Sequence, residues 1–356
     1  MKRLIILTDE NQQFLISKAN YRYFTSMDIT KIKKYFIQRE YEVIILKFSE
    51  LDLSKEYKDV YFMYQTSEAP GGFYKRYIED LIYFLESQGA VTLPGYRLLK
   101  AHHNKVFMEL MRAGFSDPAL KTIKSACFGS WTDARNYNSG FPVVIKQASN
   151  SGGAGVFLAR NKKEYGRKVK KAGGVIIANN LPALFTDYVK RSVKKIILKI
   201  YPEKSKETIT YDVQPASTSI IVQNFIPGLS GDYKVLFFGG KYFMMYRQNR
   251  ENDFRASGSG QFFPVPDQDH EGILNFARRL TEEIDYPVIG MDIGFDGSSY
   301  HMIEFQVIHI GTSALHRSKY WHEFHDGKWI RYDGLSDLEE ELSRAMCNFI
   351  EHAQGK

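Results

Sequence analysis

Asp292, Glu304 and Gln306 are the residues whose types and spacing best suit metal chemistry. They lie in the segment GMDIGFDGSSYHMIEFQ, which reads as two strands joined by a turn at Asp296-Gly297. The turn places Asp292 and Glu304 on neighbouring strands, and Glu304 and Gln306, two apart, point to the same face. Two carboxylates and an amide oxygen form an oxygen-only ligand set, which suits Mg²⁺. An exposed polar face is the alternative. It is disfavoured because the three residues are embedded among Ile, Met and Phe, where unpaired carboxylates are costly.

A lysine followed by a glycine-rich loop is the second chemical pattern. In FPVVIKQASNSGGAGVFLARN a strand-like run ends at Lys146, and a second run begins at Val156. The loop between them is longer and richer in glycine than a hairpin requires. Glycine lets backbone N–H groups approach an anion, and lysine adds a point charge that suits phosphate. The pattern indicates a loop over nucleotide phosphates, with an ordinary surface hairpin beside a solvated lysine as the alternative.

Composition indicates a soluble, folded protein of two or three domains. The chain has 356 residues and a net charge of +7, and no apolar run approaches the roughly 20 residues that span a membrane. The opening MKRLIIL is too short an apolar stretch for a signal peptide. The two cysteines, Cys127 and Cys347, are therefore expected to be free thiols in a reducing cytoplasm.

Positive charge is concentrated in one block, residues 160–206. This block contains 14 lysines and arginines and three acidic residues, so its net charge is +11 and that of the remaining chain is −4. A local basic block suggests a polyanionic partner or an anionic lipid surface. A solvated helix face remains the alternative.

The first 96 residues alternate between strand and helix patterns. The strand-like runs are RLIILT, YEVIILKF, DVYFMYQT and AVTLPG. Between them lie a helical pattern that follows Ser26, its expected N-cap, and an amphipathic helix that ends at Gly89. This alternation predicts a small parallel α/β domain. It holds no G-x-G-x-x-G, so a dinucleotide site is not indicated there.

The remaining elements are helices and antiparallel strands. YRLLKAHHNKVFMELMRAGF is expected to form one helix, with His102 and His103 as surface or cap residues. A hairpin is predicted around Gly239-Gly240. Two further amphipathic helices are predicted at EGILNFARRLTEEIDY and DLEEELSRAMCNFIEHA, and Trp321 and Trp329 are expected to pack in the core.

Taken in order, these pieces resemble the ATP-grasp superfamily. The motifs are Asn104-Lys105, PVVIK with its loop, IIVQNFIPGLSGDYKVLFFGGK, DFRASGSG and GMDIGFDG…HMIEFQ, over roughly residues 95–315. The resemblance is closest to the carboxylate–amine ligases, with the ribosomal-protein glutamate ligases, glutathione synthetases and D-alanine–D-alanine ligase. It implies an α/β (α+β) ATP-grasp fold. The implied parts are an N-terminal pre-ATP-grasp domain (1–96), a central lobe (97–226) and a C-terminal lobe (227–356).

The resemblance also implies roles for individual residues. Lys105 and Lys146 look like the lysines that contact the α- and β-phosphates, and Arg255 like the arginine that holds the γ-phosphate and the acyl phosphate formed from it. Asp232 is similar to the acidic residue near the ribose. The loop over the phosphates is matched by Ser151, Gly152, Gly153 and Gly155. The linker that reads the adenine edge is matched by Gln223, Asn224, Phe225 and Ile226. The Mg²⁺ ligands are matched by Asp292, Glu304 and Gln306.

Three features depart from the pattern of the family. Gln306 stands where the last metal ligand is usually Asn, so its reach is longer and it could instead face the acceptor substrate. Lys234 stands where an arginine is common, which removes bidentate geometry. QVIHIGTSAL replaces the usual N-x-x-P-G segment, so the substrates of named relatives do not transfer to this chain.

The implied activity is ATP-dependent ligation. ATP, with one or two Mg²⁺ ions or Mn²⁺ as a substitute, converts a carboxylate to an acyl phosphate, and an amine displaces phosphate, leaving ADP. The acids and amines are expected to be small molecules, sugars or peptides, and the protein a monomer or homodimer. Two alternatives stay open. One is a nucleic-acid or anionic-surface binding protein with a regulatory or decayed ATP site, and the other is phosphoryl transfer to a non-carboxylate acceptor.

Overall fold

The structure of the protein is a computed structural model. It describes residues 2–17, 24–137, 140–149, 155–174, 217–251, 253–255 and 261–352, and the single helical positions 189, 193, 196 and 200. Contacts divide the described residues into two compact units. The first comprises the residues up to Lys124 and from Ile226 onward. The second comprises residues 125–149 and 155–225.

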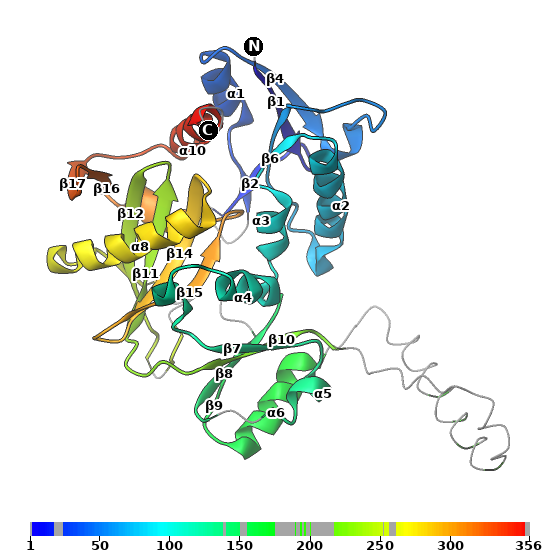
Figure 1. The fold of residues 1–356 in the computed structure, drawn as a ribbon, viewed down its shortest axis with the longest axis vertical. Coiled ribbons are helices and arrows are strands. Elements are labelled where there is room, and N and C mark those ends of the chain that lie inside the picture. Colours follow the sequence, from blue (N-terminus) through cyan, green and yellow to red (C-terminus); the bar gives the residue numbers. More distant parts are fainter. Residues whose placement is uncertain are drawn as a thin grey trace. The chain divides into compact units, whose positions relative to one another are not determined.

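A four-stranded parallel sheet forms the N-terminal part of the first unit (Figure 1). Its order is β4 (Tyr41–Lys47), β1 (Lys2–Thr8), β5 (Tyr61–Tyr64) and β6 (Val91–Leu93). Nearly every residue of β1 and β5 is buried, as expected of inner strands in a parallel sheet. Helices α1 (Ile29–Ile37) and α2 (Phe73–Ser87) pack beside β4 and β6. The predicted parallel α/β arrangement is confirmed. A short hairpin, β2 (Leu15–Ile16) with β3 (Thr25–Ser26), follows β1.

Two local predictions in this part were wrong. The N-cap of α1 is Asp28, whose Oδ1 accepts from the Lys31 N–H (3.0 Å), because Ser26 belongs to β3 and accepts from the Phe14 N–H. The single helix predicted for residues 96–115 is two helices, α3 (Tyr96–Ala101) and α4 (Lys105–Ala113). The break occurs because the Asn104 side chain caps α4 at the Phe107 N–H (3.1 Å).

An antiparallel sheet of seven strands forms the C-terminal part of the first unit. Its order is β15 (Tyr300–Gln306), β14 (Val288–Phe295), β11 (Gly231–Phe238), β12 (Lys241–Gln248), β16 (Tyr320–His325) and β17 (Lys328–Asp333), with β13 (Phe262–Phe263) also on β12. The predicted turn between β11 and β12 is confirmed, since Gly239 and Gly240 take φ of +48° and +99°. The helices of this part are α8 (His270–Ile284), α9 (Ser313–Arg317) and α10 (Leu338–His352).

The second unit is a smaller sheet with one long helix. Four antiparallel strands are ordered β7 (Ser125–Phe128), β10 (Ile220–Asn224), β8 (Val143–Gln147) and β9 (Val156–Ala159). Helix α6 (Lys162–Gly173) and the short α5 (Trp131–Ala134) share its apolar core. Gly173 permits close packing, because a Cβ there would lie 2.5 Å from that of Trp131.

A single apolar core joins the N-terminal and C-terminal parts of the first unit. The last helix, α10, contacts α1 as well as β11 and β14, and its buried Cys347 lies 3.8 Å from the Tyr41 hydroxyl. Neither Cys127 nor Cys347 forms a disulfide bond, as predicted. The finer division into parts ending at residues 96 and 226 stays a prediction.

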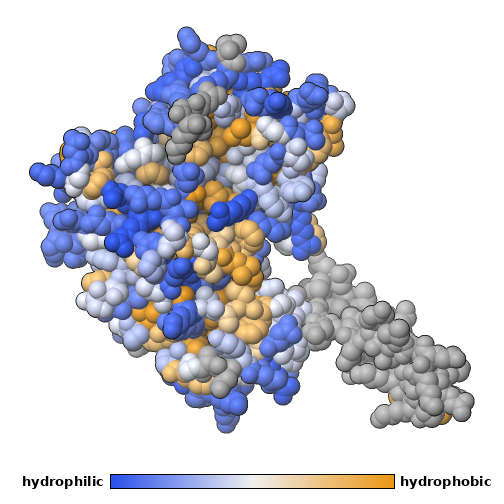
Figure 2. Space-filling view, viewed as in Figure 1, coloured by the Kyte–Doolittle hydropathy of each residue, from blue (hydrophilic) through white to orange (hydrophobic). Residues whose placement is uncertain are grey.

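Hydrophilic residues cover most of the face drawn in Figure 2, with hydrophobic residues in separate patches. Within the described ranges, no helix combines the length and apolar character needed to cross a membrane. The short 3₁₀ segments are η1 (Phe48–Glu50), η2 (Pro70–Gly72), η3 (Pro118–Lys121) and η6 (Asp267–Asp269).

Candidate active site

A cavity of about 260 Å³ lies within the first unit and brings the three expected metal ligands together with two cations, Lys234 and Arg247. Strands of the antiparallel sheet supply Lys234, Arg247, Asp292, Glu304 and Gln306. Its other lining residues are Ser17, Phe24, His102, His103, Phe262, His309, Gly311 and Ser313.

The β14–β15 hairpin positions the three expected metal ligands. Asp292 lies directly opposite Glu304, and Gly290 lies opposite Gln306. The predicted cross-strand pairing of the two carboxylates is therefore confirmed. The side chains of Glu304 and Gln306 also meet on one face, since the Gln306 amide donates to Glu304 Oε1 at 3.5 Å. Their role as metal ligands stays a prediction.

Asp292 belongs to a buried network of alternating charges. Its Oδ1 accepts from Lys234 Nζ (2.9 Å), and its Oδ2 accepts from Arg247 Nη2 (2.9 Å). Arg247 also donates to both oxygens of Asp232, through Nε (2.8 Å) and Nη2 (2.6 Å). One arginine thus bridges two carboxylates, and Lys234 completes the charge balance. Each of these buried charges needs its partner, because a buried charge without a partner destabilises the folded state.

Burial and neighbouring charges shift the pKa values of Asp232 and Asp292 in opposite directions overall. Burial, together with the neighbouring Asp292, raises the pKa of Asp232 to about 6. Burial also disfavours the ionised form of Asp292, but Arg247 and Lys234 outweigh it and hold the pKa of Asp292 below its ordinary value. Asp292 is therefore the more strongly ionised of the pair.

Sequence reasoning missed Arg247, although the signal was available. The turn at Gly239-Gly240 was predicted, and counting outward by equal steps from it places Asp232 opposite Arg247, as the structure does. Both carboxylate oxygens of Asp232 accept from Arg247, and the expected role of Asp232 near a ribose stays a prediction.

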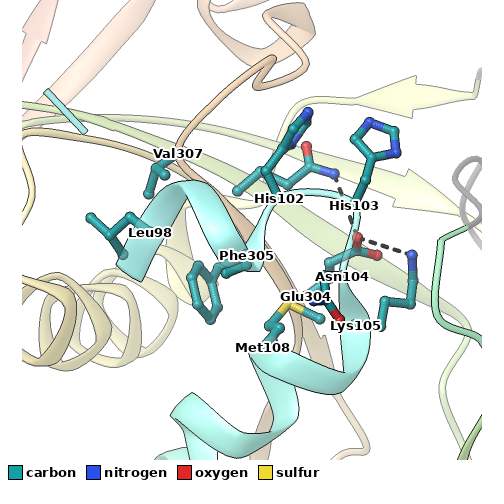
Figure 3. A pocket seen from close by; sticks show the side chains of 11 residues that line it. Leu98, His102, His103, Asn104, Lys105, Met108, Glu304, Phe305 and Val307 are labelled. Carbon is teal, nitrogen blue, oxygen red and sulfur yellow. Dashed lines mark hydrogen bonds and ion pairs between the residues drawn. The ribbon is translucent and has the colours of Figure 1, made fainter. Parts of the chain in front are cut away.

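Lys105 lies at the first position of α4 and reaches Glu304. Its Nζ is 3.5 Å from Glu304 Oε1, and Figure 3 shows the pair beside the small pocket of about 20 Å³ between α4 and β15. Buried Arg112 fixes the helix to this strand by donating to the Met302 carbonyl (3.1 Å). Lys105, which is expected to bind phosphates, therefore contacts Glu304, which is expected to bind the metal ion.

A second cluster converges on Glu68 at the edge of the same cavity. His102 Nε2 and His309 Nε2 lie 3.0 and 2.9 Å from its Oε1, and His103 Nε2 lies 3.0 Å from its Oε2. His102 is the C-cap residue of α3, as the cap alternative predicted, and it is buried beside Glu68 instead of lying on the surface. Burial lowers the pKa of His102 to about 3. Burial opposes ionisation of Glu68, but the hydrogen bonds from the histidines lower its pKa overall.

The remaining nucleotide residues lie in the second unit or in loops. Lys146 is on β8 opposite Ile221, and the pairs Gln223–Val144 and Asn224–Val143 continue the same ladder. Phe225 and Ile226 follow β10, and Gly155 takes φ of +73° before β9. Ser151, Gly152 and Gly153 lie outside the described residues, as does most of the basic block beyond residue 174.

Arg255 forms an ion pair with its near neighbour Asp253. Its Nη2 donates to Asp253 Oδ2 (2.7 Å), and its Nε donates to Oδ1 (2.9 Å). The hydrogen bonds that Arg255 donates to Asp253 raise the pKa of the guanidinium and keep it cationic. Its expected contact with a γ-phosphate stays a prediction.

No protein-family model matches the sequence, and no curated protein is similar to it at a significant level. Solved structures are similar over nearly the whole chain. D-cycloserine synthetase DcsG matches with a TM-score of 0.50 at 10% identity, covering 98% of this chain and 99% of the other. The fold is the ATP-grasp fold. The fold class predicted from the sequence, α/β with an N-terminal parallel sheet, is thereby confirmed.

Two further structures match with lower TM-scores. One is a RiPP-associated ATP-grasp ligase from Chryseobacterium gregarium, in complex with ADP and a leader and core peptide (0.49, 12% identity, 99% and 97% covered). The other is a RimK domain ATP-grasp protein from Sphaerobacter thermophilus (0.47, 11% identity, 98% and 99% covered). At such identities the likeness shows the fold alone. Activity must therefore be argued from the site.

Proposed function

We propose that this ATP-grasp protein is an ATP-dependent ligase that activates a carboxylate as an acyl phosphate and joins it to an amine. The observation that carries the proposal is the wall of the cavity formed by Asp292, Glu304 and Gln306. These oxygens lie on adjacent strands beside Lys234 and Lys105, in the fold that the sequence motifs imply. Cations and oxygen ligands in one cavity suit a substrate that carries phosphates.

The donor set at this wall fits Mg²⁺. It consists of two carboxylates and one amide, all oxygen donors, and Asp292 is held ionised by its neighbouring cations. We propose that Asp292, Glu304 and Gln306 hold one or two Mg²⁺ ions. When bound, the metal would supply positive charge that neutralises the negative charge developing on the phosphates during transfer.

We assign the phosphate contacts to the lysines and the arginine that the motifs indicate. Lys105 and Lys146 would bind the α- and β-phosphates, and Arg255 would bind the γ-phosphate, oriented by its ion pair with Asp253. The linker at residues 223–226 would read the adenine edge, with Asp232 near the ribose. The glycine-rich loop at residues 151–155 would cover the phosphates and exclude water.

The reaction follows from the weakness of a carboxylate as an electrophile. Transfer of the γ-phosphoryl group to a carboxylate oxygen gives an acyl phosphate and ADP. The amine nitrogen then forms a bond to the acyl carbon, the C–O bond to phosphate breaks, and the amine proton is lost. Positioning and positive charge supply the catalysis, so the proposal needs no covalent nucleophile on the protein.

The test is product analysis with purified protein, Mg²⁺ and ATP against a panel of carboxylates and amines. ADP and phosphate should appear only in reactions that contain both a carboxylate and an amine that the protein accepts as substrates. AMP with pyrophosphate would refute activation through the γ-phosphoryl group. A phosphorylated acceptor without released phosphate would instead establish the phosphotransferase alternative.

The basic block supports a second, separate role. Val189, Val193, Ile196 and Ile200 are each helical and 41 to 63% exposed, and in a continuous helix their spacing of four, three and four residues would place them on one face. An apolar face among lysines is typical of a helix that binds an anionic lipid surface, and it argues against nucleic acid, which needs no such face. Sedimentation with phosphatidylserine vesicles, but not with phosphatidylcholine vesicles, would support this role. Equal sedimentation with both would refute it.

A further inference from the structure

The Glu68 cluster is the strongest chemical feature that the ligase reaction does not use. Glu68, His102 and His103 each present one ligand atom, and these atoms all lie within 4.8 Å of one another. Glu68 comes from the loop after β5, whereas the histidines come from the connection between α3 and α4. Folding therefore brings Glu68 to a pair of histidines that are adjacent in the sequence.

Backbone strain accompanies the cluster. His103 and His309 both adopt the left-handed conformation, with φ of +51° and +49°. This conformation is strained for a residue with a Cβ, and it persists where the surrounding structure holds it. At His103 it lets two consecutive side chains turn toward one carboxylate, and their rings lie 4.1 Å apart at 89°.

We propose that Glu68, His102 and His103 bind a transition-metal ion, with Zn²⁺ as the best match. Two imidazole nitrogens and one carboxylate oxygen are ligands that Zn²⁺ takes and Mg²⁺ does not favour. Ligand atoms around tetrahedral Zn²⁺ lie about 3.3 Å apart. His102 Nε2 lies 3.0 Å from Oε1 of Glu68 and His103 Nε2 lies 3.0 Å from Oε2, so each imidazole is near this distance from one oxygen of the carboxylate, and the three ligand atoms lie within 4.8 Å of one another. Binding of the metal ion would displace the protons that lie between the imidazole nitrogens and the Glu68 carboxylate.

His309 completes the site as a positioning residue. Its Nε2 lies 2.9 Å from Glu68 Oε1 and 2.8 Å from the Thr66 carbonyl oxygen. Partners of this kind orient a metal-binding carboxylate. Three protein ligands leave one tetrahedral position open. Because His102 and His103 line the 260 Å³ cavity, that position is available to water or to an anionic or amine group of a small molecule.

The experiment uses the full chain, freed of metal with EDTA and titrated with Co²⁺ as a spectroscopic substitute for Zn²⁺. The wild type should bind one equivalent with the strong visible absorption of a four-coordinate ion, and Zn²⁺ should displace it. His103→Ala and Glu68→Gln should each weaken binding by at least about 10- to 100-fold. The matched control is His325→Ala, since His325 also contacts a glutamate, Glu323 (3.1 Å), but lies outside the cluster.

A second variant separates this site from the expected Mg²⁺ site. Glu304→Gln removes an oxygen ligand from β15 and should leave the Co²⁺ spectrum and stoichiometry unchanged. Loss of the absorption in Glu304→Gln alone would place the ion at the other site and overturn the proposal. So would equal Co²⁺ affinity in His103→Ala and His325→Ala, or an absence of stoichiometric binding by the wild type. Circular dichroism checks that each variant is folded, and the result does not depend on ligase activity.

Discussion

Removal of Arg247 tests the buried network most directly. Its guanidinium bridges Asp232 and Asp292 through three hydrogen bonds of 2.6 to 2.9 Å, and its whole residue is 9% exposed. Arg247→Leu would leave Asp232 without the cation that contacts both its oxygens. Loss of one partner from a buried ion pair costs about 3–5 kcal/mol, because the remaining charge stays desolvated. We therefore expect the free energy of unfolding to fall by about that amount.

Urea unfolding followed by fluorescence measures this loss. Arg331→Leu is the control, because Arg331 also contacts two carboxylates but is exposed, and it should cost no more than about 1 kcal/mol. Arg247→Leu combined with Asp232→Asn should recover part of the loss, since the unpaired charge is removed with its partner. The stabilising role of the network would be refuted if Arg247→Leu lowered the free energy of unfolding no more than Arg331→Leu does. It would also be refuted if the losses from Arg247→Leu and Asp232→Asn were strictly additive in the double variant.

The same network predicts a pH dependence with a definite sign. The pKa of Asp232 is raised from 3.8 to about 6, so the folded state binds its proton more tightly than the unfolded state does. Its contribution to stability is full below pH 4 and is lost as pH rises toward 6 and above. Asp292, with its lowered pKa, acts oppositely and loses its contribution on acidification below its ordinary pKa. Asp232→Asn should therefore flatten the stability curve between pH 4.5 and 7, and parallel curves would contradict this assignment.

Three further predictions concern the nucleotide and the metal. Lys146→Ala and Arg255→Ala should each lower turnover by on the order of 10²-fold or more with an unchanged circular dichroism spectrum, and near-normal ADP release would show that the phosphate site is misplaced. Mg²⁺ with ATP should raise the melting temperature, whereas no shift at saturation would count against the ATP site. Gln306→Ala should raise the Mg²⁺ concentration needed for activity, with Gln306→Asn intermediate. An unmoved Mg²⁺ curve with a changed acceptor affinity would make Gln306 a substrate residue instead.

Local patterns were enough to predict the turn between β11 and β12 and the pairing of Asp292 with Glu304 across β14 and β15. Alternating apolar residues and the Gly239-Gly240 turn fix the register of β11 and β12, and the turn at Asp296-Gly297 brings Asp292 and Glu304 together. In each case the contact is between strands joined by a short turn. Such contacts follow from period and turn chemistry alone.

The histidine cluster could not be predicted because its contacts are not local. Glu68 and His102 are 34 positions apart, with helices α2 and α3 between them, and Glu68 and His309 are separated by most of the chain. The apolar spacing across residues 96–115 favours one continuous helix, and the capping side chain of Asn104 overrides it. A break of three residues decides whether His102 faces solvent or Glu68.

The charges around the two clusters suggest why the first unit could hold two kinds of metal ion. The buried network and its neighbour Glu304 contain three carboxylates, those of Asp232, Asp292 and Glu304. Three cations contact them, namely Arg247, Lys234 and Lys105, so the charges balance. A wall that is already neutral has little attraction for a bare divalent ion. Mg²⁺ is therefore expected to arrive with the phosphates of ATP, which supply the missing negative charge. Glu68 contacts imidazoles instead of lysine or arginine side chains. Its carboxylate charge is then available to a metal ion in the absence of nucleotide.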